Sequence, residues 1–126
     1  DASGGIWCWG GRLEDPTQPS PTPARVETTG GWTDFELGAF VLCARKSDAS
    51  LWCQGRNVEG QLGLGDLNPR TGMVQVATQV SAYSLGRFHT CIVTAGELRC
   101  AGHNDEGQLG LGDTTDRSTF VPVALP

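Results

Sequence analysis

The chain has 126 residues, which is typical of one domain, and its 9 basic and 14 acidic residues give a net charge of −5. This acidic balance, with Lys46 as the single lysine, disfavours nucleic-acid and anionic-membrane partners, because both need a basic surface. The 18 glycines and 7 prolines favour tight turns, and no apolar run approaches the roughly 20 residues of a membrane span, so we expect no membrane insertion.

Short runs rich in β-branched and aromatic residues, bounded by Gly, Pro and Asp, predict β-strands along the whole chain. In chain order they cover residues 7–10, 24–26, 32–37, 40–44, 52–55, 73–76, 80–85, 88–93, 99–102 and 120–123. No window keeps an apolar period of 3.6 residues, so we expect almost no helix. The pattern predicts an all-β, antiparallel fold.

The heptapeptide GQLGLGD shows that these strands belong to a repeat, because Gly60–Asp66 returns 47 residues later as Gly107–Asp113. A period of 40 to 50 residues indicates stacked supersecondary units. Within the motif, we expect the glycines to adopt left-handed backbone, the leucines to plug between units and the aspartates to cap turns.

Aligning the chain on its cysteines gives units at about residues 4–46, 49–94 and 96–126. The first unit lacks the strand that should precede Trp7, and the third lacks its last two strands. We therefore expect a single array of about two and a half four-stranded units, incomplete at both ends. Open strand edges of this kind pair with other chains unless they are covered.

Four of the five cysteines face each other in pairs across predicted hairpins. Cys43 lies opposite Cys53, and Cys91 lies opposite Cys100. Facing residues have Cβ atoms about 4.5–5.5 Å apart, within reach of a disulfide after modest adjustment, so we expect two disulfides and an oxidising compartment. The partner of Cys8 should lie about ten residues upstream, before Asp1 (about one hairpin length, as for the other pairs), so the chain is either a piece of a longer array or bonded to another molecule.

The third hairpin also gathers zinc-ligand types, namely His89, Cys91, Cys100 and His103. The preceding unit argues against zinc, because it keeps both cysteines but has Val41 and Arg56 in place of the two histidines. A Cys91–His89 nucleophile lacks a third, orienting group, and a disulfide would remove its thiolate. We expect neither a catalytic residue nor a bound metal here.

A calcium site is a further alternative, since several acidic and amide side chains cluster in the third unit: Asn104, Asp105, Glu106, Asp113 and Asp116. The second unit keeps Glu59 and Asp66 but has Val58 and Pro69 in place of Asp105 and Asp116. Structural turns are therefore favoured over a metal site, and we expect no cofactor.

Candidate binding side chains are Trp7, Trp9, Arg56 and Arg87. Trp9 is the better tryptophan, because the positions that match it hold Gln54 and Ala101 and so do not demand an aromatic residue. The alternative for the tryptophans is packing between units, and for the arginines an ordinary solvated charge.

These repeated marks resemble the regulator of chromosome condensation repeat family, whose units combine W-G-x-N with G-Q-L-G-x-G-D and a G-x-x-H-T strand. The second unit carries Trp52, Gly55, Asn57 and Gly60–Asp66, and the third carries Gly102, Asn104, Gly107–Asp113 and, ahead of them, Gly86–Thr90. The resemblance implies a β-propeller, usually of seven four-stranded blades. The cysteine-bearing pattern is similar to predicted extracellular bacterial proteins of this family.

The resemblance also bears on function, since a secreted inhibitory protein with this propeller binds its target without catalysis. We expect a non-enzymatic, secreted β-propeller segment that recognises a protein or a surface polymer. The alternative is a structural subunit that joins other copies of itself head to tail, through its open blade edges, into a ring or an extracellular fibre.

Overall fold

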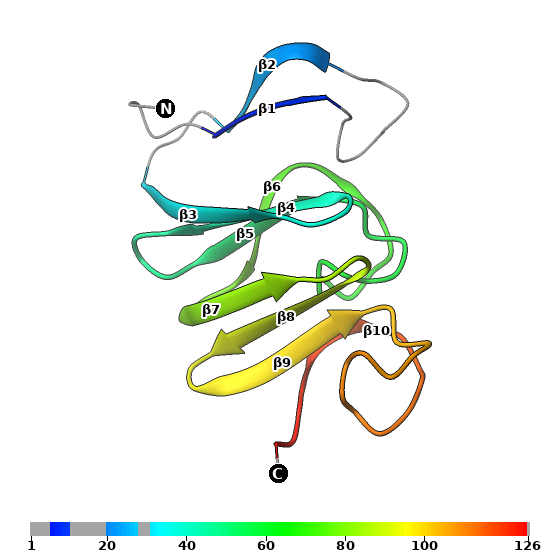
Figure 1. Ribbon diagram of the computed structural model, residues 1–126. Helices are drawn as coiled ribbons and strands as arrows, with labels where there is room; N and C mark the ends of the chain where they lie inside the picture. Colours follow the sequence, from blue (N-terminus) through cyan, green and yellow to red (C-terminus); the bar gives the residue numbers. More distant parts are fainter. Residues whose placement is uncertain (1–5, 11–19, 28–30, 126) are drawn as a thin grey trace.

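The computed structural model describes residues 6–10, 20–27 and 31–125, the last of these with side chains. The described residues form ten β-strands and no helix, and hence no helix long and apolar enough to cross a membrane (Figure 1). The strands are β1 (Ile6–Gly10), β2 (Ser20–Glu27), β3 (Trp32–Leu37), β4 (Val41–Lys46), β5 (Leu51–Gly55), β6 (Arg70–Ala77), β7 (Val80–Leu85), β8 (His89–Thr94), β9 (Glu97–Gly102) and β10 (Arg117–Pro122). The predicted strands are thus all present.

Antiparallel pairing groups these strands into three sheets that follow one another along the molecule (Figure 1). The order β3-β4-β5-β6 forms one four-stranded sheet, here blade I, and β7-β8-β9-β10 forms another, blade II. Strands β1 and β2 pair with each other and form a half-blade. The all-β repeat architecture predicted from the sequence is confirmed.

The blades are displaced by two strands from the units read along the sequence. Blade I takes β3 and β4 from the first unit and β5 and β6 from the second, and blade II joins the second unit to the third in the same way. The two strands of the third unit therefore finish blade II as a complete four-stranded sheet. The half-blade holds two strands in the described residues.

Both predicted disulfides are present, one in each blade. Cys43 pairs in register with Cys53 between β4 and β5, and Cys91 pairs with Cys100 between β8 and β9. Their Sγ atoms are 2.02 and 2.10 Å apart, and the Cα atoms of each pair are 4.1 Å apart. The hairpin register inferred from the sequence therefore holds in both units.

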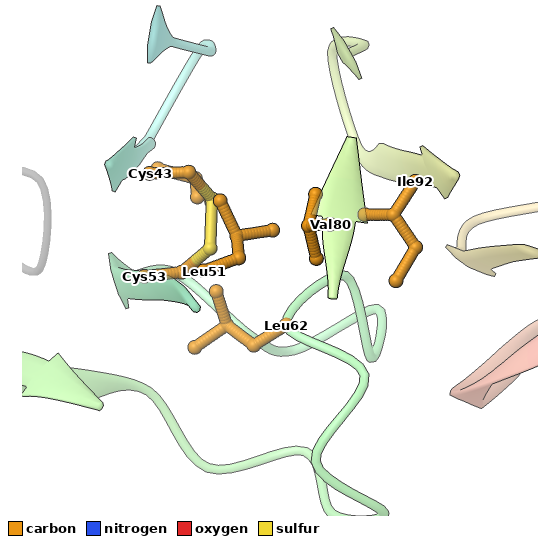
Figure 2. Close-up of a cluster of buried hydrophobic side chains, with 7 residues drawn as sticks. Cys43, Leu51, Cys53, Leu62, Val80 and Ile92 are labelled. Atoms are coloured by element: carbon orange, nitrogen blue, oxygen red, sulfur yellow. A yellow bond between two sulfur atoms is a disulfide. The ribbon is translucent and has the colours of Figure 1, made fainter. Parts of the chain in front are cut away.

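The main core lies between blades I and II, where the disulfide face of blade I meets the opposite face of blade II (Figure 2). Its buried members are Val41, Cys43, Leu51, Cys53, Leu62, Val80 and Ile92. Leu62 comes from the GQLGLGD loop rather than from a strand, and it is 1% exposed. The sequence predicted this plugging role, which adds the apolar area of a full leucine to the contact.

Polar groups hold the same two blades together at β3 and β7. Tyr83 on β7 donates its hydroxyl to Asp34 on β3 at 2.5 Å, and Arg45 donates to the same carboxylate at 2.9 and 3.1 Å. Burial opposes ionisation of Asp34, but these hydrogen bonds outweigh it and lower the pKa of the carboxyl. Arg45 also donates to the backbone carbonyls of Val80 and Ser81, so one arginine bridges both blades.

A buried asparagine organises each GQLGLGD loop. Asn57 accepts the backbone N–H of Leu62 at 2.9 Å and donates to Asp66 and to the carbonyl of Asn68. Asn104 makes the equivalent bonds in the second copy, where Asp113 is also paired with Arg117. These aspartates cap turns, as predicted.

The loop of blade I reaches across to the outer strand of blade II. Gly65 donates to the carbonyl of Ser118 at 2.8 Å, and Leu64 forms a bridge with Thr119. Gly63 has a φ of 68°, and a Cβ built on it would lie 2.2 Å from the ring of Phe120. Only glycine therefore satisfies both the left-handed backbone and the contact with the next blade.

Candidate functional site

Two phenylalanines stand at equivalent turns at one end of the blades. Phe40 lies in the turn between β3 and β4, and Phe88 lies in the turn between β7 and β8. Both turns close in the same way, with Gly38 donating to Val41 and Gly86 donating to His89, each at 2.8 Å. The repeat thus places one aromatic ring per blade at the same end of the molecule.

Arg56 follows β5 and lies between these two rings. Its guanidinium carbon is 5.8 Å from the centroid of Phe40 and 5.5 Å from that of Phe88, within the range of cation–π attraction. Glu59 holds it in a two-point pair, with Nε–Oε2 at 3.1 Å and Nη2–Oε1 at 2.8 Å. That pairing lowers the pKa of Glu59, so the arginine is oriented and largely neutralised before any partner arrives.

Arg87 lies over Phe88 as well, with its guanidinium carbon 5.1 Å from the ring centroid. It is exposed, and among the described residues it has no carboxylate within ion-pair distance. Phe88 is therefore within cation–π range of one compensated arginine and one uncompensated arginine. The second of these is the cation in this cluster that is ready to accept an anionic group.

His103 takes in blade II the position that Arg56 takes in blade I, and each donates its backbone N–H to the carbonyl of the preceding phenylalanine at 2.9 Å. Its ring meets Phe88 edge to face at 6.3 Å. Nε2 lies 3.0 Å from Asp105 and Nδ1 lies 3.3 Å from Asp116. Desolvation opposes the charge, but the two carboxylates outweigh it and raise the pKa of His103.

We call this cluster the arginine–phenylalanine row; its members are Phe40, Arg56, Arg87, Phe88 and His103. It combines planar cations with aromatic faces, the side-chain types enriched at the energetic centres of protein interfaces. Among the described residues its uncompensated cation is Arg87, because Arg56 is paired with Glu59 and His103 lies against Asp105 and Asp116. The row suits recognition of an anionic, partly apolar surface.

The row unites two of the four binding residues that the sequence proposed. Arg56 and Arg87 are 31 positions apart in the chain and meet on one ring. Trp7 and Trp9 belong to β1, and their side chains lie outside the described residues. The same holds for the side chain of Cys8, whose backbone pairs with Ala24.

Sequence reasoning missed the three other members of the row. A signal was available, because Phe40 and Phe88 each precede a disulfide cysteine by three residues and recur 48 positions apart. His103 was considered only as a metal ligand, although its match with Arg56 was visible. The period of the sequence shows that Phe40 is equivalent to Phe88 and that Arg56 is equivalent to His103. Only the folded turns show that these residues meet at one place.

The metal and nucleophile alternatives find no support in the geometry. Cys91 and Cys100 are joined to each other, so neither offers a thiolate. The ring of His89 packs against Gly86, and burial lowers its pKa. In the part of the chain that the structure describes, no group of three or more His, Cys, Asp or Glu side chains is placed to hold a metal ion.

No protein-family model and no curated protein matches the chain by sequence. Solved structures do match it: yeast RCC1 (Prp20) bound to Kap60 at 18% identity and a TM-score of 0.78, and human WBSCR16 at 21% and 0.79. Prp20p from Saccharomyces cerevisiae matches at 14% identity and 0.76. The matches cover 98%, 100% and 96% of this chain, but only 32%, 36% and 34% of those chains. The chain thus has the fold of RCC1-type β-propeller blades and spans about a third of such a propeller, which confirms the resemblance at the level of the fold.

Proposed function

We propose that this chain is a non-enzymatic, secreted β-propeller segment that recognises another protein or surface polymer through the arginine–phenylalanine row. The observation that carries the proposal is the placement of both Arg56 and Arg87 within cation–π range of the Phe88 ring. A carboxylate of the partner pairs with the uncompensated guanidinium of Arg87, and the exposed part of the rings accepts an apolar side chain. A protein partner would therefore present an acidic segment that carries aromatic or aliphatic residues, and a polymer partner would present anionic groups beside apolar ones.

Two further observations support this role. Structures with the same fold are described as Prp20 bound to Kap60 and as Prp20p with binding properties to Gsp1p and histones, so this propeller type binds proteins elsewhere. Two disulfides in a chain of this size are typical of oxidising compartments, which supports secretion.

A displayed library of random 12-residue peptides, selected on the oxidised protein, tests the proposal. We expect the selected peptides to be rich in Asp and Glu and to lose at least tenfold in affinity toward the Arg87→Ala variant. Arg99→Ala is the control, because Arg99 is a half-buried arginine on β9, paired with Glu97 and outside the row. Neutral or basic selected peptides, or equal losses in both variants, would contradict the proposal.

Head-to-tail assembly of copies is the second candidate, and one contrast between the blades favours it. Val41 and Cys43 are buried on the disulfide face of blade I, whereas their equivalents His89 and Cys91 on blade II are only half-buried. The disulfide face of blade II is thus open to another blade. Light scattering of the isolated chain tests this: assembly predicts a mass above that of the 13.3 kDa monomer, and a monodisperse monomer at micromolar concentration refutes it.

A further inference from the structure

Lys46, the single lysine of the chain, lies between two tryptophan rings of blade I. Its Nζ is 4.8 Å from the centroid of the Trp32 ring and 4.5 Å from that of the Trp52 ring, within the range of cation–π attraction. The two rings are perpendicular, with their centroids 6.3 Å apart. We call Trp32 and Trp52 the tryptophan pair; it is a cation site that already holds a cation.

Three neighbouring strands bring these side chains together. Trp32 at the start of β3 pairs in register with Lys46 at the end of β4, and Trp52 on β5 lies opposite Ala44. Ala44 and Lys46 are two positions apart on β4, so their side chains share one face of the sheet. Phe40 lies at the other end of β4, so the tryptophan pair is separate from the arginine–phenylalanine row and does not depend on it.

The two rings are held in different ways. Trp52 Nε1 donates to Ser50 Oγ at 2.9 Å, and Ser50 Oγ donates to Asp48 Oδ1 at 2.5 Å. Ser50 is 4% exposed, so this chain of hydrogen bonds is shielded from water. Trp32 Nε1 is buried without a hydrogen-bond partner, and packing against Ala44 and its neighbours holds that ring. One wall of the site is therefore fixed, and the other can adjust to the size of the cation.

The repeat fold does not require an aromatic pair at this place. In the register of blade II, the three matching positions carry no aromatic ring; they are Val80, Thr94 and Arg99. Blade II nevertheless forms a complete four-stranded sheet. The tryptophan pair is thus a property of blade I alone among the two four-stranded blades.

The tryptophan pair suits a different cation better than it suits lysine. An ammonium group carries three N–H donors and is strongly hydrated in water. Among the described residues, Lys46 has no carboxylate within ion-pair distance, and the ring faces lack the oxygen acceptors that its N–H groups would use. A quaternary ammonium has no N–H group to satisfy, and aromatic faces are the surfaces that bind it.

The site is open to exchange. Trp32, Lys46 and Trp52 are each only half-buried, so solvent reaches the cation. The lysine stem is flexible, so the side chain can turn out into water. The net charge of −5 also attracts cations to the molecule.

We propose that the tryptophan pair binds small quaternary ammonium compounds of the choline type, and that Lys46 is a resident cation that such a ligand displaces. The space that Lys46 leaves is that of one alkylammonium side chain between two rings, which a compact trimethylammonium fills. Because Lys46 is tethered beside the site, it competes at a high effective concentration. The unaltered protein therefore binds the ligand weakly, and removal of Lys46 strengthens binding.

A nuclear magnetic resonance titration of choline chloride against the oxidised 126-residue protein tests this proposal. Ring currents of the tryptophans move the trimethyl proton signal upfield, and that shift reports occupancy. We expect saturable binding to the unaltered protein and at least tenfold tighter binding to Lys46→Ala. Trp52→Leu in the Lys46→Ala background should lose that gain. Arg99→Ala is the matched control, because it removes the same unit of charge in blade II and should leave the affinity for choline unchanged.

Thermal unfolding provides a second readout that does not rely on the tryptophan signal. Choline should raise the unfolding midpoint of Lys46→Ala more than that of the unaltered protein, whereas ammonium chloride at the same concentration should not. Phosphocholine distinguishes the source of the group: binding tenfold weaker than that of choline assigns the free alcohol, and equal or tighter binding assigns the phosphate ester.

Four results would overturn the proposal. They are the absence of choline binding to the unaltered protein, equal affinity of that protein and Lys46→Ala, a gain in Arg99→Ala as large as that in Lys46→Ala, and equal effects of choline and ammonium. A peptide carrying trimethyllysine that binds at least tenfold more tightly than choline would also overturn it, because the ligand would then be a modified protein.

Discussion

The contact between the loop of blade I and the outer strand of blade II can be tested with two glycines that differ in little else. Gly63 and Gly110 hold the same place in the two GQLGLGD copies, with φ values of 68° and 70°. A Cβ on Gly63 would lie 2.2 Å from the ring of Phe120, whereas a Cβ on Gly110 would meet Val123 at 3.3 Å. Replacing each by alanine imposes the same backbone strain but very different packing.

The expected loss in the free energy of unfolding is the sum of two contributions, backbone strain and packing. Left-handed backbone costs a non-glycine residue about 1–2 kcal/mol, and both variants incur this cost. Phe120 packs against the core between the blades, so displacing its ring adds an overpacking cost of about 1–3 kcal/mol for Gly63→Ala alone. We therefore expect losses of about 2–5 kcal/mol for Gly63→Ala and about 1–2 kcal/mol for Gly110→Ala.

Urea unfolding of the oxidised protein measures this difference, with the slope of the transition checked for two-state behaviour. Phe120→Leu, made alone and in the Gly63→Ala background, completes a double-mutant cycle. The smaller side chain makes room for the new methyl group, so the double variant should recover part of the stability that Gly63→Ala loses. Equal destabilisation by the two alanines, or no recovery in the double variant, would show that the loop does not pack on the neighbouring blade as described.

Three other variants or treatments probe the remaining contacts. Tyr83→Phe should cost about 1 kcal/mol at neutral pH, since it removes a bond to a partly exposed carboxylate. The lowered pKa of Asp34 gives stability that is full above its ordinary pKa and is lost as the pH falls through the folded value, so the difference between this variant and the parent should vanish in acid; a difference that persists there would exclude Asp34 as the acceptor. Reducing both disulfides should lower the free energy of unfolding by about 2–3 kcal/mol for each closed hairpin, and a change of less than 1 kcal/mol in total by calorimetry would show that the hairpins are constrained without them. Asn57→Ala should lower the free energy of unfolding by about 2–4 kcal/mol, because it leaves the buried N–H of Leu62 unpaired. A thermal unfolding midpoint close to that of the parent protein would show that this hydrogen bond does not stabilise the loop.

The strands, their register and both disulfides were predictable because they depend on local pattern and on symmetry along the chain. Cys43 and Cys53 are separated by one hairpin, so alternation alone places them opposite each other. The motif glycines were equally readable, since left-handed positions leave few other choices. These features need no knowledge of how distant segments meet.

The arginine–phenylalanine row was only half predictable. The two arginines were named as contacts, but the ring that joins them depends on the stacking of one blade on the next, which brings the loop after β5 to the turn before β8. The displacement between sequence units and blades was likewise invisible, because a repeat has the same period wherever its first residue is placed. Which strands share a sheet is decided by pairing across the hairpins, and no period reports it.

The two-strand displacement between sequence units and blades determines what happens when a unit is duplicated or when the chain is cut. A gene segment that encodes one unit does not encode one sheet; it supplies the second half of one sheet and the first half of the next. Duplicating it lengthens the array by one blade while tying the new material into both neighbours, in each case across a disulfide hairpin such as that of Cys91 and Cys100. Conversely, a division at the unit boundary near residue 95 separates β8 from β9 and leaves two unpaired edges, whereas a division between β6 and β7 leaves whole sheets on either side. Recombination that copies a whole unit therefore keeps every strand paired, whereas a break at a unit boundary leaves strands without their partners in the sheet.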